Sequence, residues 1–144
     1  MPKYFNLIIV TPEKPVLEEK VSFVSLPGYE GELGIMAGHI PYIAQLKEGI
    51  LRYTSEKEKG EFAIMGGFAQ ISDDTVSVFA EGAELATEIN AELERQKIQR
   101  LKDILALKDK SMDIETAQAN LKKSILRMKL LTSATRRQSR PPKR

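Results

Sequence analysis

The chain of 144 residues has no cysteine and a single histidine, His39. Without cysteine it can form no disulfide, no thiolate metal site and no cysteine nucleophile. One imidazole cannot supply the several histidines of a typical zinc site. We therefore expect no metal centre, and the absence of thiols excludes every mechanism that depends on them.

Long hydrophobic runs are also missing. The longest clear run near the start, Leu7 to Val10, is far shorter than the roughly 18 residues needed to cross a membrane. No basic segment followed by an apolar stretch opens the chain, so we expect no signal peptide. With 42% hydrophobic and 29% charged residues, the composition is that of a globular protein.

Glycine and proline are absent between Gly82 and Pro141. Before this gap, short apolar runs alternate with turn residues; from Thr75 to Ala80, for example, every second residue is apolar. Many short runs of this kind predict an all-β sandwich or barrel, which we assign to residues 1–86. The gap itself is rich in good helix formers, so the fold class is β followed by α.

Two antiparallel helices in a hairpin are predicted for residues 87–133. The first runs from about Glu88 to Leu107, starts at Thr87 or Glu88, and has apolar residues three and four positions apart. Its stripe contains Ile98, Leu101 and Leu105. Ser111 or Asp113 is predicted to cap the second helix. There Ile114, Leu121 and Met128 repeat every seven residues, which is typical of a helix packed against a partner helix.

Acidic residues are missing after Glu115. From Thr116 to Arg144 there are nine basic residues, whereas Met1 to Glu115 holds 22 − 9 = 13 basic and 20 acidic residues, a net charge of −7. A separation of this kind indicates an anionic partner for the C-terminal end. The basic tail of residues 134–144 is expected to be disordered.

The densest cluster of glycines lies between Glu30 and Pro41. It contains no G-x-G-x-x-G and no Gly-Lys-Ser/Thr sequence, so a phosphate loop is excluded and no cofactor is expected. Strand-turn-strand structure is the plainest interpretation. A hydrolase using Glu30, Glu32 and His39 stays open as an alternative.

The basic second helix allows three interpretations: a solvated face, a nucleic-acid site, or a contact with an acidic protein surface. No aromatic residue lies in either predicted helix, so base stacking has little support. The apolar seam favours a protein partner and argues against nucleic acid.

Three glycine-containing segments, together with an opening Val10-Thr11-Pro12, have a characteristic order and spacing. They are Glu30-Gly31-Glu32-Leu33-Gly34-Ile35, Gly38-His39-Ile40-Pro41 and Gly66-Gly67-Phe68. In these segments the chain resembles the epsilon subunits of bacterial F-type ATP synthases, over about residues 4 to 132.

The resemblance implies a β-sandwich of about ten short strands followed by two helices. It implies a non-catalytic subunit of the central stalk, at the cytoplasmic face of the bacterial cell membrane, that couples proton-driven rotation to ATP synthesis. Its β-domain would contact the gamma subunit and the rotor ring of c subunits. The residues expected at that contact are Tyr29, Gly31, Glu32 and His39.

The helical domain of the family is implied to inhibit ATP hydrolysis by extending toward the alpha and beta subunits. The cations expected to contact an acidic segment of beta are Lys122, Lys123, Arg127 and Lys129. Some members also bind ATP through an Ile-Asp-x-x-Arg-Ala motif. Here that motif is degenerate, with Ile89 kept, Asn90 for Asp, Leu93 for Arg and Glu94 for Ala; in the second helix Lys123 replaces an arginine and Arg127 remains. We expect ATP binding to be weak or absent at millimolar concentration.

Overall fold

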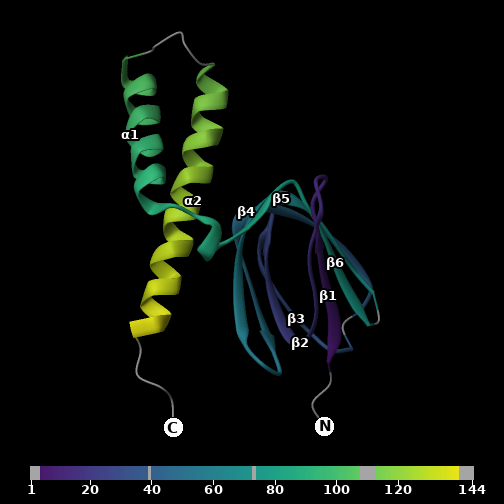
Figure 1. The fold of residues 1–144 in the computed structure, drawn as a ribbon. Coiled ribbons are helices and arrows are strands. Elements are labelled where there is room, and N and C mark those ends of the chain that lie inside the picture. The colour runs from purple at the N-terminus through teal and green to yellow at the C-terminus, as the bar shows by residue number, and fades with distance from the viewer. Residues whose placement is uncertain (1–3, 39, 73, 108–112, 140–144) are drawn as a thin grey trace. The chain divides into compact units, whose positions relative to one another are not determined.

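The computed structural model describes residues 4–38, 40–72, 74–107 and 113–139, the last seven of them by their backbone alone (Figure 1). The chain forms two compact units, Met1–Leu85 and Ala86–Arg144, here called the β-unit and the helical unit. Among the described residues, no helix has the length and apolar character needed to span a membrane.

The described part of the β-unit contains seven strands. They are β1 (Phe5–Val10), β2 (Pro15–Gly28), β3 (Gly31–Met36), β4 (Tyr42–Ser55), β5 (Lys59–Ile71), β6 (Thr75–Ala80) and β7 (Ala83–Leu85). Fewer strands occur than the ten or so expected, because β2 and β4 each run for 14 residues and β5 for 13. Each of these long strands pairs with different neighbours along its length.

The sheet closes on itself. Its strand order is β1-β6-β5-β4-β2-β3, and β1 also pairs with β2 while β7 pairs with β5. The first half of β2 lies antiparallel to β1 and its second half lies antiparallel to β3, whereas β1 and β6 are parallel. The predicted β-sandwich architecture is confirmed, with the strands enclosing one core (Figure 1).

Alternate residues of the strands fill this core. Val76, Val78 and Ala80, predicted to share a face of β6, are each at most 3% exposed. They pack with Leu7 and Ile64 and with buried residues of the other strands. Burying a valine or leucine side chain stabilises a fold by about 1.5–3 kcal/mol. The alternating pattern therefore accounts for a closed sheet with one face of each strand in the core.

The helical unit starts with a short 3₁₀ turn, Ala86–Glu88, followed by α1 (Ala91–Leu107) and α2 (Ile114–Ser139). The predicted start of the first helix at Thr87 or Glu88 is wrong, because both residues lie in the 3₁₀ turn. Asn90 caps α1 instead: its Oδ1 accepts a hydrogen bond from the Leu93 N–H at 3.1 Å. Asparagine is among the best residues at this position.

The second helix begins as predicted and ends later than predicted. Asp113 Oδ2 accepts a hydrogen bond from the Thr116 N–H at 3.3 Å and so caps α2, while Ser111 lies outside the described residues. The helix continues to Ser139, so the expectation of disorder from residue 134 is wrong as far as Ser139. No glycine or proline interrupts the segment before Pro141, and a proline disfavours helix at the residue before it.

The two helices pack through a small apolar cluster. Leu101 and Ile104 of α1 meet Ala117 of α2, with Leu105 and Leu121 beside them. Ile114, a predicted member of the seam, is 52% exposed. Leu126 and Leu130 of α2 are buried as well.

Candidate functional site

The turn between β2 and β3, with the start of β3, holds three of the four residues predicted to contact the rotor ring. Gly31 has a φ of 145°, and a side chain on Gly28 would overlap the Gly31 carbonyl oxygen. These two glycines let the chain reverse within Tyr29 and Glu30. Tyr29 is 65% exposed, and its N–H donates to the Gln45 carbonyl oxygen of β4 at 2.8 Å. The backbone of the turn is thus tied to the sheet while the tyrosine ring faces solvent.

An open cavity of about 330 Å³ lies beside this turn. It is lined by Gly28, Tyr29, Glu30, Gly31, Glu32, Leu33, Tyr42, Ala44 and Gln45. The structure therefore brings Tyr29, Gly31 and Glu32 together at one concave surface. His39, the fourth predicted contact, lies outside the described residues.

Glu32 is held by neighbours on two other strands. Its Oε1 accepts a hydrogen bond from the Ser25 hydroxyl. Arg52 lies between two carboxylates, with its Nη1 3.9 Å from Glu32 Oε1 and its Nε 3.9 Å from Glu61 Oε1. Glu61 is 6% exposed. Because buried charges need partners, Arg52 is anchored at Glu61 and in turn orients Glu32.

The alternative hydrolase can be compared with the structure only at Glu30 and Glu32, because His39 lies outside the described residues. Glu30 is exposed and Glu32 is engaged by Ser25 and Arg52. Within the described ranges no three or more His, Asp or Glu side chains lie together in a way that could hold a metal ion.

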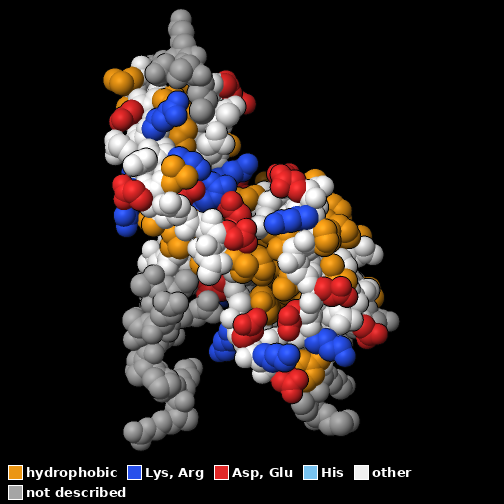
Figure 2. Space-filling view, viewed as in Figure 1, with side chains coloured by type: hydrophobic (Ala, Val, Ile, Leu, Met, Phe, Trp, Pro, Cys, Tyr) orange, Lys and Arg blue, Asp and Glu red, His pale blue; other side chains and the backbone are white. Residues whose placement is uncertain are grey.

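An exposed apolar row crosses the outer face of β4, β5 and β6. Gln45 pairs with Phe68, and Phe68 pairs with Phe79, so these three side chains share a face with Ile43. Ile43 is 68%, Phe68 49% and Phe79 38% exposed, and the two phenylalanine rings stack with centroids 5.1 Å apart. Figure 2 shows that uncovered hydrophobic side chains gather over the β-unit. Exposed apolar surface of this kind is typical of a protein-contact face.

A basic cavity of about 330 Å³ lies between α1 and α2. It is lined by Lys97, Arg100, Leu101, Asn120, Lys123, Ser124 and Arg127. The four predicted inhibitory cations therefore separate into two groups. Lys123 and Arg127 line the cavity, whereas Lys122 and Lys129 are exposed to solvent.

The degenerate ATP motif is only partly assembled at this cavity. Asn90 caps α1, Leu93 is 48% exposed, and the Ile89 N–H donates to the Ala86 carbonyl oxygen at 3.2 Å. None of these three residues is among the described lining residues, in contrast to Lys123 and Arg127.

Sequence reasoning missed Lys97 and Arg100, the two cavity cations on α1. Each precedes a buried apolar residue by four positions, Leu101 and Ile104 respectively, so both lie at the margin of the packed face. In the degenerate ATP motif Glu94 is only the residue that replaces Ala. Its place four residues before Ile98 of the apolar stripe was the signal that its carboxylate would be buried.

The description of the family model that matches residues 4–86 is "ATP synthase, Delta/Epsilon chain, beta-sandwich domain". The ATP synthase epsilon chain of Nitratidesulfovibrio vulgaris (strain DP4) is 39% identical over 93% of this chain and 100% of its own length. The epsilon chain of Syntrophobacter fumaroxidans is 39% identical over 90% of this chain and 97% of its own length.

Two solved structures share the fold. A chain of the Euglena gracilis mitochondrial ATP synthase, in a structure that includes the c-ring, superposes with a TM-score of 0.69 at 25% identity over 94% of this chain and 83% of its own. A chain from the central stalk and c-ring of the Tetrahymena thermophila enzyme has a TM-score of 0.58 at 16% identity, covering 90% of this chain and 97% of its own.

Proposed function

Because the chain belongs to the epsilon chains of ATP synthase, which are non-catalytic subunits of the central stalk in a membrane-associated complex, we propose that its two units have different functions. The β-unit joins the gamma subunit and the rotor ring at the cytoplasmic face of the membrane. The helical unit restrains ATP hydrolysis by contact with the alpha and beta subunits. The similarity to epsilon chains over 93% of the chain carries this proposal.

Two surfaces of the β-unit support its proposed contacts with the gamma subunit and the rotor ring. The turn around Tyr29 and Glu32 offers an exposed aromatic ring and a carboxylate oriented by Arg52. The exposed apolar row of Ile43, Phe68 and Phe79 offers hydrophobic area on the strands β4, β5 and β6. We assign the polar turn to the rotor ring and the apolar row to gamma, because long-lived interfaces have an apolar core.

The exposed cations Lys122 and Lys129 support the proposed inhibition of ATP hydrolysis by the helical unit. Neither lines the cavity between the helices, so both are available to an acidic partner while α1 and α2 stay paired. Each exposed ion pair contributes only about 0–1 kcal/mol. Inhibition by this route is therefore the sum of several small terms and is sensitive to salt.

The deciding experiment measures ATP hydrolysis by the cognate catalytic head with three forms of this protein. These are the full chain, a chain truncated after Glu88, and the Lys122→Gln/Lys129→Gln variant. We expect the full chain to inhibit, the truncated chain to bind without inhibiting, and the double variant to inhibit several-fold less at equal occupancy. Lys102→Gln, which removes an exposed charge from α1, is the matched control and should inhibit like the parent.

Inhibition by the truncated chain as strong as that of the full chain would remove the helices from the mechanism. Failure of every form to bind the head would overturn the stalk assignment of the β-unit. Tight, steeply salt-dependent binding to duplex DNA in the same assay series would instead support the nucleic-acid alternative.

A further inference from the structure

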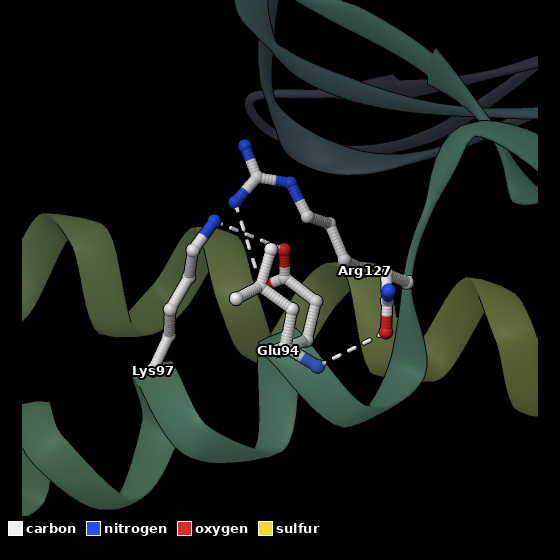
Figure 3. Close-up of polar contacts among 5 residues, drawn as sticks. Glu94, Lys97 and Arg127 are labelled. Atoms are coloured by element: carbon white, nitrogen blue, oxygen red, sulfur yellow. Dashed lines mark hydrogen bonds and ion pairs between the residues drawn. The ribbon is translucent and has the colours of Figure 1, made fainter.

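Glu94 on α1 has a buried carboxylate between two cations. The residue is 5% exposed, its Oε1 lies 3.5 Å from Lys97 Nζ, and its Oε2 lies 3.7 Å from Arg127 Nη1 of α2. Figure 3 shows the Lys97 and Arg127 side chains pointing toward this carboxylate from the two helices. Among the described residues, none donates a hydrogen bond to Oε2, so its closest cation, Arg127, stabilises this oxygen through charge.

The same two cations belong to the basic cavity. Lys97 and Arg127 line it together with Arg100 and Lys123, and none of the described lining residues is acidic. Four cations around one small space repel one another unless an anion lies close by. Glu94 stands beside this group and supplies that anion from within the chain.

We propose that Glu94 is the internal counter-anion of the basic cavity. Its carboxylate links Lys97 of α1 to Arg127 of α2 and takes the part that a phosphate-type anion would otherwise play. The hairpin therefore needs no bound anion to neutralise the cations of this cavity. This inference is independent of the proposed function, since it concerns only how the two helices are paired.

The Glu94→Gln substitution indicates which ligand the basic cavity would bind without this carboxylate. The amide keeps nearly the same shape but removes the negative charge, so the cavity cations lose their neutralising group. Guanidinium and ammonium groups converging on one space favour a multivalent oxyanion, since arginine presents paired donors to phosphate oxygens. The variant should gain an affinity that the parent chain lacks.

Isothermal titration of the full-length chain with inorganic pyrophosphate, in magnesium-free buffer, tests the proposal. We expect Glu94→Gln to bind pyrophosphate at least ten-fold more tightly than the parent. Glu92→Gln is the matched control: it makes the same change two residues away, where the side chain is 69% exposed and paired with Arg95. It should bind no better than the parent.

Equal affinity of the parent and Glu94→Gln would overturn the proposal, and so would an equal gain in Glu92→Gln or the absence of binding by all three. If Glu94→Gln loses its helical circular dichroism, the double variant Glu94→Gln/Arg127→Gln decides. Removing both members of a pair is less harmful than removing one, so the double variant should recover helical signal. A double variant as impaired as the single one would show that the pair does not join the helices.

Discussion

Gly67 is the residue at which β5 changes partners. From Phe62 to Ile64 the strand pairs with β7, and from Gly67 onward it pairs with β6. Gly66 and Gly67 have φ values of 94° and 127°, which favour glycine strongly. A side chain on Gly67 would overlap the Phe79 carbonyl oxygen and come within 2.9 Å of the Ala80 Cα.

We therefore expect Gly67→Ala to lower the free energy of unfolding of the β-unit by about 3 kcal/mol, from backbone strain and overpacking together. Urea denaturation followed by circular dichroism measures this. Gly31→Ala is the control, since Gly31 also has a positive φ, of 145°, but faces open space; it should cost about 1 kcal/mol. Equal losses in the two variants would contradict the crowding argument.

Tyr53 makes the β-unit sensitive to alkaline pH. Burial of its ring, and then the negative charges of Glu58 and Glu19, raise the pKa of Tyr53 above its ordinary value of 10.0. The folded state thus holds this proton more tightly than the unfolded state does. The resulting stability is fully present below the unfolded pKa and is lost as pH rises through the folded pKa.

Tyr53→Phe keeps the ring, which stacks on Phe62 with centroids 6.3 Å apart, but has no proton to lose. The variant should therefore lose less stability than the parent when the pH rises above about 10. Urea midpoints at neutral and alkaline pH compare the two chains. Tyr42→Phe, at an exposed position, is the control. A parallel fall for the parent and Tyr53→Phe would refute the titration argument.

At the scale of an element, Asn90 sets where α1 begins. Its side chain satisfies the Leu93 N–H, one of the first-turn donors that a helix leaves unpaired. We expect Asn90→Ala to destabilise the first turn by about 1 kcal/mol and Asn90→Asp to preserve it. Amide hydrogen exchange at Leu93 should accelerate about five-fold in the alanine variant; unchanged exchange would show that Asn90 does not hold the turn.

The boundaries of elements followed from local chemistry in some places and not in others. Asp113 is recognisable as a cap because it directly precedes an apolar repeat, whereas the continuation of α2 to Ser139 was not predicted. Asn90 was missed because its position matched a degenerate ligand motif, which obscured its role as a helix cap. The joining of short runs into β2, β4 and β5 depends on pairing with distant strands, and no local signal shows such joining.

At the scale of the molecule, the two units differ in how much core each contains. The core of the β-unit extends from Phe5 to Ala80 and draws on every one of its longer strands. Among the described residues, the cluster shared by α1 and α2 contains Leu101, Ile104 and Ala117 with two flanking leucines. A pair of helices with so small a core has little cooperativity.

A chain ending at Leu85 should therefore fold alone and unfold in one cooperative thermal transition. A fragment of residues 86–144 should lose its helical signal gradually. Thermal circular dichroism of the two fragments, beside the full chain, measures both. A cooperative helical fragment, or a β-fragment without a transition, would contradict this division of stability.

The amino-acid sequence by itself determined the order of β-rich and helical segments, the charge separation, and the family, because periodicity, turn residues and motif spacing are local properties. Only the tertiary structure decided that Arg52 orients Glu32, that Ile43, Phe68 and Phe79 form one exposed row, and that Glu94 faces Arg127. Each of these groupings joins residues far apart in the chain. Strand register and helix packing bring them together, and both are set by the burial of a shared core.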